Sequence, residues 1–431
     1  MALLFFTLAV LSLSGYSSGK SFWAAAFLAL MAGFLLVRDK SQYQQVLIDG
    51  LSDSSLAMVL LTFFVSGVLS VLLTIGGLCD GLVYLAVAAH IPAAILPVCI
   101  FLLCVLVSSS TGTTSGTVAA ATPVLLPLAV TLGCDPALVM GAIVSGGFFG
   151  DNLAPVSDTT IASATTQETE IITVVRSRFK YSVIAGLGAA VLFIWQGFRT
   201  TVPVTAMDAL DTSSLLGLIL LICPVLLVIM MLRGKNFIYA LMFNTVLAAL
   251  LCLVTGKLCF DLFFSAEGVV AQGIGNCMNA AVLCMLIFMI IRILKVSGVF
   301  ESIAKTAVRR CRTYKQAEAI VGFLAMLGSA MMGGATYSIL LSGGLARNLL
   351  KNFNVDKARG ANILDGLACG TAGLLPYGGA VLYAVSCSTA TGMVDGNFTA
   401  FDFIPYTYHC MLLLAVYWIA IATGFGKKFD A

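Results

Sequence analysis

The sequence predicts an all-α membrane protein that crosses a bilayer roughly ten to twelve times. Three observations lead to this prediction. Of the 431 residues, 60% are hydrophobic and only 10% are charged, whereas a soluble protein carries about 25% charged residues. Apolar runs close to the ~20 residues that span a bilayer recur along the chain. The hydrophilic connections between these runs are short, so lipid must cover most of the surface.

Uninterrupted apolar runs predict the membrane helices. These runs lie at 2–13, 21–37, 56–78, 91–108, 181–195, 215–232, 237–254, 280–296, 319–332 and 406–424. Four more apolar regions are broken by Gly, Pro, Ser and Thr, at 114–131, 137–166, 338–350 and 361–394. Irregular backbone at membrane depth is tolerated only where protein or a cavity surrounds it. We therefore expect re-entrant hairpins and discontinuous helices in these four regions.

The hydrophilic connections indicate how the chain is oriented. Most Lys and Arg fall at 38–45, 176–180, 233–235 and 304–315. The cluster in the last of these marks the cytoplasmic side, since cytoplasmic loops carry an excess of basic residues. Residues 299–308 are predicted either to lie flat on the membrane as an amphipathic helix or to form an ordinary loop helix. The expected location is the cell (inner) membrane, with many passes.

The composition argues against several classes of protein. The net charge of +3 and the lack of a basic face with interleaved aromatics argue against nucleic-acid binding. The 13 Cys form no C-x-x-C pair and only His90 and His409 are present, so we expect no Cys/His metal site and no cofactor. No phosphate-binding loop is present, which leaves ion gradients or facilitated diffusion as the energy source.

Two stretches, 106–156 and 327–377, present the same order of helix breakers. The matched pairs are Gly112 and Gly333, Asp135 and Asp356, and Pro155 and Pro376: 333 minus 112, 356 minus 135 and 376 minus 155 are each 221. Paired broken segments are typical of transporters built from two repeats. We expect one repeat at 1–200 and another at 201–431, in inverted orientation. The alternative is a shared bias toward small residues in packed helices.

A run of hydroxyls and Gly at 107–119 interrupts an apolar stretch. An unwound backbone there exposes carbonyls, and Ser110, Thr111, Thr113 and Thr114 add neutral oxygens. Such oxygens suit a hard cation such as sodium. The alternative is tight helix packing, with each hydroxyl bonded to its own helix.

Two carboxylates lie in the apolar segment 146–160. Asp151 follows Gly-Gly-Phe-Phe-Gly, and Asp158 follows a Pro-containing break. Because a carboxylate at membrane depth is costly, it indicates a functional site. The break allows Asn152, Ser157 and Thr159 to converge on the two acids. We predict that Asp151 and Asp158 bind sodium or a proton. The alternative for Asp158 is a helix cap.

The second half offers Asp365, three residues after Asn362 and on the same helix face. We expect these two residues to contribute to the same ion site, or Asp365 to pair with Arg359 or Arg347 near the membrane edge. Arg292 and Lys295 end an apolar run. They either extend to the interface or act as a counter-charge to an anionic substrate.

The segment 150–160, Gly-Asp-Asn-Leu-Ala-Pro-Val-Ser-Asp-Thr-Thr, resembles the core motif of the NhaC-type sodium/proton antiporter family, within the ion transporter superfamily. That family usually has Lys where Asn152 stands and Ser where Ala154 stands. The stretches Asp365-Gly and Leu-Pro-Tyr-Gly at 375–378 are similar to its later motif. The resemblance covers roughly residue 54 to the C-terminus. It implies inverted repeats with paired hairpins, usually in a homodimer, and exchange of sodium for protons.

The sequence therefore predicts a secondary antiporter that exchanges sodium and protons through Asp151 and Asp158. The alternative is a coupled transporter or exchanger of small carboxylates or amino acids, with sodium as the co-ion. A channel is a weaker fit because paired broken segments suit alternating access. No nucleophile–base pair predicts an enzyme.

Overall fold

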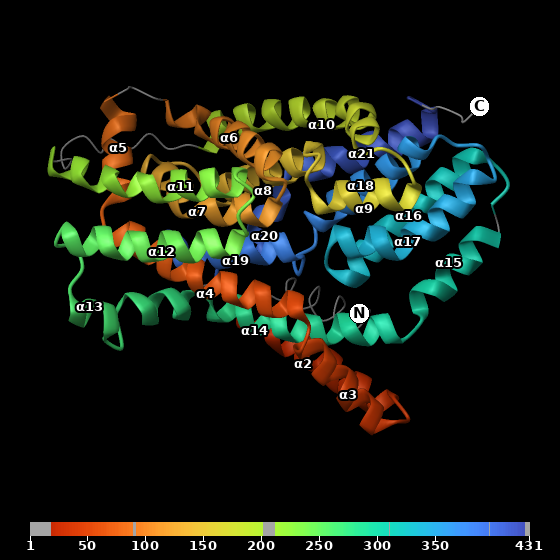
Figure 1. Ribbon diagram of the computed structural model, residues 1–431, viewed down its shortest axis with the longest axis horizontal. Helices are drawn as coiled ribbons and strands as arrows, with labels where there is room; N and C mark the ends of the chain where they lie inside the picture. Colours follow the sequence, from red (N-terminus) through yellow and green to blue (C-terminus); the bar gives the residue numbers. More distant parts are fainter. Residues whose placement is uncertain (1–18, 89–91, 201–211, 310, 396, 427–431) are drawn as a thin grey trace.

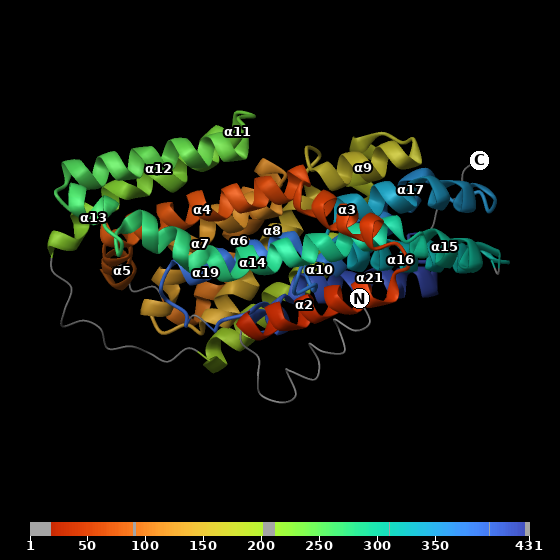
Figure 2. The same ribbon diagram turned by 90° about the horizontal axis from the view of Figure 1, so that it is seen from below.

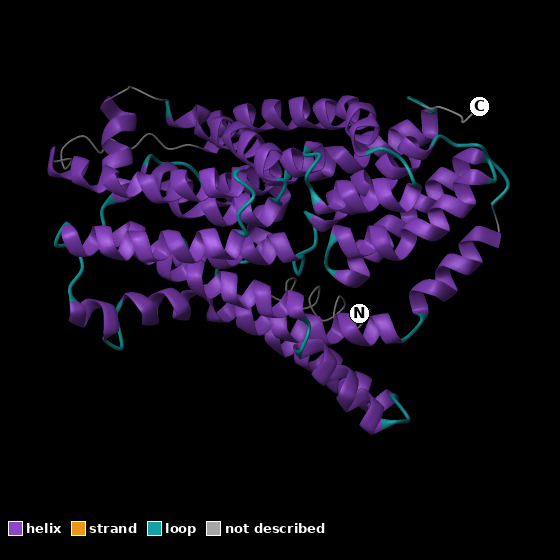
Figure 3. Cartoon of the chain, in the orientation of Figure 1, coloured by secondary structure: helices purple, strands orange, loops and turns teal. Residues whose placement is uncertain are grey.

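A computed structural model describes residues 19–88, 92–200, 212–309, 311–395 and 397–426. These residues form helices and loops and no strand (Figure 3). In this described part, eight helices are long and apolar enough to cross a membrane, or nine if a pair bent by 55° at residue 407 counts as one span. The prediction of an all-α polytopic membrane protein is confirmed. The expected span at 2–13 lies outside the described residues.

The helices of the N-terminal part are α2 (Gly19–Leu36), α3 (Lys40–Leu51), α4 (Ser54–Ile75), α5 (Leu78–Ala88), η1 (Ala93–Ile95), α6 (Leu96–Thr111), α7 (Thr114–Thr131), α8 (Pro136–Leu153), α9 (Asp158–Gln167) and α10 (Ile171–Thr200). Those that follow are η3 (Thr212–Leu221), α11 (Ile222–Leu232), α12 (Phe237–Val254), α13 (Phe260–Phe264), α14 (Val269–Val296), α15 (Val299–Arg309), α16 (Tyr314–Met332), α17 (Ala335–Lys351), α18 (Lys357–Ala372), α19 (Gly379–Ala390), α20 (Ala400–Phe403), η4 (Ile404–Tyr406) and α21 (Tyr408–Thr423). Most of the long helices run along the longest axis of the molecule, and α12, α4 and α14 lie side by side in both views (Figures 1 and 2).

Two helix pairs turn back on themselves at a glycine. α6 ends at Gly112 and α16 ends at Gly333, each with φ 68°. This left-handed conformation is easy for Gly and unfavourable for residues with a Cβ. Because α6 and α7 lie toward the left end of Figure 1 and α16 and α17 toward the right end, the two hairpins enter from opposite ends of the molecule.

Two further helices are interrupted where they meet these turns. The chain leaves helical geometry between α8 and α9, and again between α18 and α19. Gly112 packs against Val156 and Ser157 in the first break, and the Gly379 amide donates to the Gly333 carbonyl across the second, at 3.1 Å. Asp135 and Asp356 cap the starts of α8 and α18. This matched order supports two related halves, and their inverted duplication remains a prediction.

The glycines of α8 bring its backbone against α6. A Cβ added at Gly146 would lie 2.4 Å from the Phe101 carbonyl oxygen, and one at Gly150 would lie 2.5 Å from the Val105 carbonyl oxygen. The Ser108 hydroxyl donates to the Gly147 carbonyl at 2.6 Å. The Gly-rich sequence before Asp151 therefore fixes the end of α8 in the centre of the packed helices.

The basic connection at 304–315 begins inside α15 (Val299–Arg309), a helix with one buried face. In α15, Phe300 and Ala304 are buried while Lys305 and Arg309 are exposed. This helix lies at the right-hand end of the molecule in both views (Figures 1 and 2). Its position on a membrane surface remains a prediction.

Candidate functional site

A cavity of about 480 Å³ lies where both hairpin turns and both helix breaks meet. The first half of the chain contributes hydroxyls, among them Thr113, Thr114 and Thr159, and three carboxylates, those of Asp53, Asp151 and Asp158. The second half contributes backbone and small side chains at 333–336 and 379–380, the basic residues Arg292 and Lys295, and large apolar and aromatic side chains that include Phe288, Tyr377 and Tyr383. The cavity therefore has an acidic side and a side that is neutral to basic.

Asp151 lies in the last turn of α8 and is only 7% exposed. Its Oδ2 accepts hydrogen bonds from the Thr114 hydroxyl at 2.7 Å and from the Thr114 amide at 3.3 Å. Its Oδ1 is buried and accepts no hydrogen bond from the described residues. A buried, unpartnered carboxylate oxygen beside a cavity needs a proton or a cation to offset its lost hydration.

Asp158 begins α9 and is exposed to the cavity. Its Oδ1 accepts from the Thr159 amide at 2.9 Å, and its Oδ2 accepts from the Thr336 hydroxyl on α17 at 2.7 Å. The Ser157 and Thr159 hydroxyls bond each other at 3.0 Å. Of the five residues predicted to converge at this break, Asp151, Asp158 and Thr159 line the cavity and Ser157 bonds Thr159, whereas Asn152 donates to Asp365. Thr336 contacts this break from the other half.

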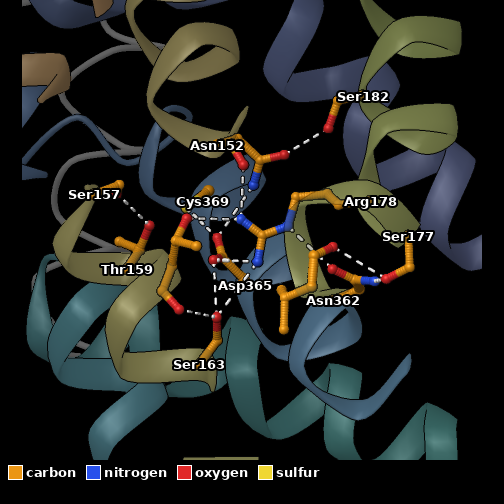
Figure 4. Close-up of polar contacts among 12 residues, drawn as sticks. Asn152, Ser157, Thr159, Ser163, Ser177, Arg178, Ser182, Asn362, Asp365 and Cys369 are labelled. Carbon is orange, nitrogen blue, oxygen red and sulfur yellow. Dashed lines mark hydrogen bonds and ion pairs between the residues drawn. The ribbon is translucent and has the colours of Figure 1, made fainter. Parts of the chain in front are cut away.

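Asp365 lies in a separate buried network beside the cavity (Figure 4). Its Oδ2 is 2.6 Å from an Arg178 nitrogen, and both side chains have 0% exposure. Asn152 and the Cys369 thiol each donate to its Oδ1 at 3.1 Å. Neither of its expected alternative partners contacts it, since Arg359 pairs with Glu318 and Arg347 with Glu168.

Arg178, on α10, organises this network, and it is not among the site residues predicted from the sequence. It donates to the Asn152 carbonyl at 2.7 Å and to the Asn362 side-chain oxygen at 3.1 Å. Asn152 and Asn362 therefore support a buried ion pair and do not line the cavity. Asn152 stands where the resembled family usually has Lys, and here the cation beside Asp365 is Arg178.

The hydroxyl-rich break at 107–119 was predicted either to bind an ion or to serve helix packing, and its residues differ in this respect. Ser110 and Thr111 donate to the Leu106 and Val107 carbonyls of their own helix, at 2.8 Å and 2.9 Å. They do not line the cavity, so they agree with the alternative in which each hydroxyl bonds its own helix. Thr113 caps α7 and lines the cavity, and Thr114 binds Asp151. Ser110 and Thr111, before the turn at Gly112, therefore bond their own helix, and Thr113 and Thr114, after it, line the cavity.

The other side of the cavity has basic residues and uncapped helix starts. α17 and α19 begin after Gly334 and Gly378, and neither helix has a side-chain cap. Arg292 and Lys295, near the end of α14, line the same cavity. An Arg292 nitrogen lies 3.1 Å from Asp49 on α3. Hydrogen bonds from Gln45 and Arg292 lower the pKa of Asp49.

The described residues contain no group of three or more His, Cys, Asp or Glu side chains placed to hold a metal ion. The oxygens at and around Asp151 belong to carboxylates and hydroxyls, those of Asp151, Asp158, Thr114 and Thr159. Oxygen donors of this kind suit a hard cation. Sodium therefore fits this site as a transported ion.

Comparison with known proteins gives a consistent picture. The model of the Na+/H+ antiporter family matches residues 1–198 and 201–425. The chain is 30% identical over 172 residues to the malate-2H+/Na+-lactate antiporter of Bacillus subtilis, covering 40% of the chain and 36% of that relative. It is 24% identical over 350 residues to the Na+/H+ antiporter NhaC of Alkalihalophilus pseudofirmus, covering 76% of the chain and 74% of that relative. It is 33% identical over 138 residues to an uncharacterized Na+/H+ antiporter of Haemophilus influenzae, covering 31% of the chain and 29% of that relative.

Proposed function

The chain belongs to the Na+/H+ antiporter family, and from this premise we propose that it exchanges sodium for protons across the cell membrane by alternating access. Membership confirms the family that the motif at 150–160 predicted. The family is one of multi-pass membrane transporters rather than of enzymes. The homodimer that the resemblance implies remains a prediction.

The observation that carries the proposal is the position of Asp151. One of its oxygens is fixed by Thr114, and the other is buried without a partner at the cavity. An uncompensated carboxylate is costly at membrane depth, and either a proton or a bound cation neutralises it. Because the two compete for the same oxygens, release of one follows binding of the other. This competition is the physical basis of exchange.

Asp158 extends the site across the two halves of the chain. Its bond to Thr336 joins the start of α9 to the first turn of α17. A cation held by Asp151 and Asp158 would therefore contact both the first break and the second hairpin. In this proposal, the charge state of Asp158 controls whether α9 and α17 remain joined. The bound ion is thereby coupled to the relative position of the two hairpins.

The test is proton flux from proteoliposomes under an imposed sodium gradient. We expect wild type to move protons when sodium is added, and Asp151→Asn to lose nearly all of this flux, because the neutral amide does not exchange a proton for sodium. Asp261→Asn, which changes an exposed acid on α13, is the matched control and should retain wild-type flux. Sodium-driven flux that survives in Asp151→Asn would contradict the proposal.

The basic side of the cavity favours a second candidate, transport of a small carboxylate with sodium as the co-ion. Helix N-termini bind anions through free amides, and here two uncapped N-termini face a cavity also lined by Lys295. A relative is named for malate and lactate. A thermal-shift screen of short organic acids discriminates the candidates, because ligand binding raises stability. Stabilisation by an acid only with sodium present favours this function, and no stabilisation excludes it.

A further inference from the structure

The Arg178–Asp365 pair is the most completely buried ion pair of the site region. Both side chains are inaccessible, and the nitrogen–oxygen distance is 2.6 Å. A buried ion pair of this kind gains little net stability over an apolar pair of the same volume, whereas removal of one partner leaves a costly bare charge. A fully buried pair beside a transport cavity therefore calls for a reason other than stability.

Every polar atom of the pair is held in place. Arg178 directs Nε to Asn362, one terminal nitrogen to the Asn152 carbonyl and the Thr160 hydroxyl, and the other to Asp365 and Ser163. Asp365 accepts from Asn152 and Cys369 on Oδ1, and from Ser163 and Arg178 on Oδ2. The other groups that hydrogen-bond the pair are neutral, and Arg178 is the cation that pairs with Asp365 (Figure 4). The titratable groups that interact electrostatically with Asp365 are Asp151, Cys369 and Tyr417.

The pair is separated from the exchange cavity by a single layer of residues. Asn152 directly follows Asp151, and Cys369 lines the cavity while its thiol donates to Asp365. Asp365 is therefore a further carboxylate close to the ion pathway, in addition to Asp53, Asp151 and Asp158, which line the cavity. Without a resident cation it would need a sodium ion or a proton, as Asp151 does.

We propose that Arg178 is a resident counter-cation that keeps Asp365 out of the transport cycle and thereby sets the number of protons exchanged for sodium. The inference rests on the proposed exchange of sodium and protons, and it deepens that function. Arg178 does not contact the cavity, so it acts as a positioning residue through Asp365. With Arg178 in place, Asp151 and Asp158 are the carboxylates that change partners.

The experiment counts protons released per chain when purified protein in weakly buffered detergent is saturated with sodium. Wild type gives the reference number. In Arg178→Gln, Asp365 loses its counter-cation and takes up a proton that sodium displaces, so we expect the number to rise by about one. Arg178→Lys keeps the charge and should give the wild-type number. An unchanged number in a folded Arg178→Gln protein overturns the inference.

The double variant Arg178→Gln/Asp365→Asn provides a second test, which can be made even if Arg178→Gln alone does not fold. It removes both charges together, so it should release the wild-type number of protons and melt at a higher temperature than Asp365→Asn, which leaves Arg178 unbalanced. A double variant that is no more stable than Asp365→Asn, or whose proton number differs from wild type, overturns the inference.

A matched control comes from the other buried ion pair. Arg359 and Glu318 are 2.9 Å apart and 3% and 1% exposed, and neither lines the cavity. Arg359→Gln should lower the melting temperature and leave the proton number unchanged, and an altered number there overturns the link to Arg178. If wild type itself releases no protons on sodium addition, the proposed exchange fails. If wild type releases protons and Arg178→Gln releases the same number, the inference fails and the proposed exchange stands.

Discussion

At the residue scale, one threonine determines how Asp151 is presented. Both the amide and the hydroxyl of Thr114 bond Oδ2, whereas Oδ1 is buried and has no hydrogen-bond partner among the described residues. A hydrogen bond to a charged group contributes about 1.5–3 kcal/mol. The hydroxyl therefore stabilises the ionised form that binds sodium. Thr114 belongs to the hydroxyl-rich break, yet its neighbours Ser110 and Thr111 bond only their own helix.

We predict that Thr114→Val raises the sodium concentration for half-maximal exchange roughly tenfold or more, because the removed hydroxyl stabilises the carboxylate by more than about 1.4 kcal/mol. Thr114→Ser keeps the hydroxyl and should stay near wild type. Sodium-dependent proton flux in proteoliposomes measures both variants. Equal sodium dependence in the Val and Ser variants would show that the hydroxyl does not hold Asp151 in its binding form.

The sequence was informative about single acids and uninformative about their partners. Asp151 and Asp158 were predictable because carboxylates in an apolar segment are costly and rare. The role of Arg178 was not predictable, because it stands in an ordinary basic connection and its partner Asp365 is 187 residues away (365 minus 178). An ion pair across such a separation is a property of tertiary packing. For the same reason Asp365 was expected beside the other two acids.

At the scale of the helices, the positions of Gly and Pro predict where the chain breaks. They predict the length of each helix less well. Gly112 and Gly333 end their helices with the same positive φ, as breakers at matched positions should. Pro123 and Pro127, by contrast, lie inside α7 without ending it. They are tolerated because neighbouring helices surround that segment, an effect of packing that a local pattern does not contain.

The matched breaks place unlike chemistry at equivalent points of the two halves. Asp158 lies at the start of α9, and at the same offset α19 starts at Gly379, since 379 minus 158 is 221. One helix start therefore presents a carboxylate to the cavity, whereas the other has no side-chain cap and its Gly379 amide donates to the Gly333 carbonyl. The cavity is therefore acidic at the first break, while the described residues at 373–380 in the second break contribute no carboxylate to it.

At the scale of the whole molecule, a second buried ion pair joins four helices. Arg359 on α18 pairs with Glu318 on α16, and it also donates to the Tyr181 hydroxyl on α10 and to the Ala420 carbonyl on α21. Phe425, after the end of α21, accepts a further bond from Arg359 at 2.7 Å. The pair therefore fastens the C-terminal helix to the second hairpin and the second broken helix.

We predict that Glu318→Gln lowers the free energy of unfolding by about 3–5 kcal/mol, because it leaves the buried Arg359 charge without its partner. Glu168→Gln is the matched control. It breaks an ion pair with Arg347 whose side chains are 37% and 54% exposed, and exposed pairs contribute only about 0.2–1 kcal/mol. Thermal unfolding of both variants in detergent, followed by circular dichroism, measures the difference. Similar melting temperatures for the two variants would mean that the four helices are held together by apolar packing alone, and that Arg359 is balanced by the carbonyls and the hydroxyl around it.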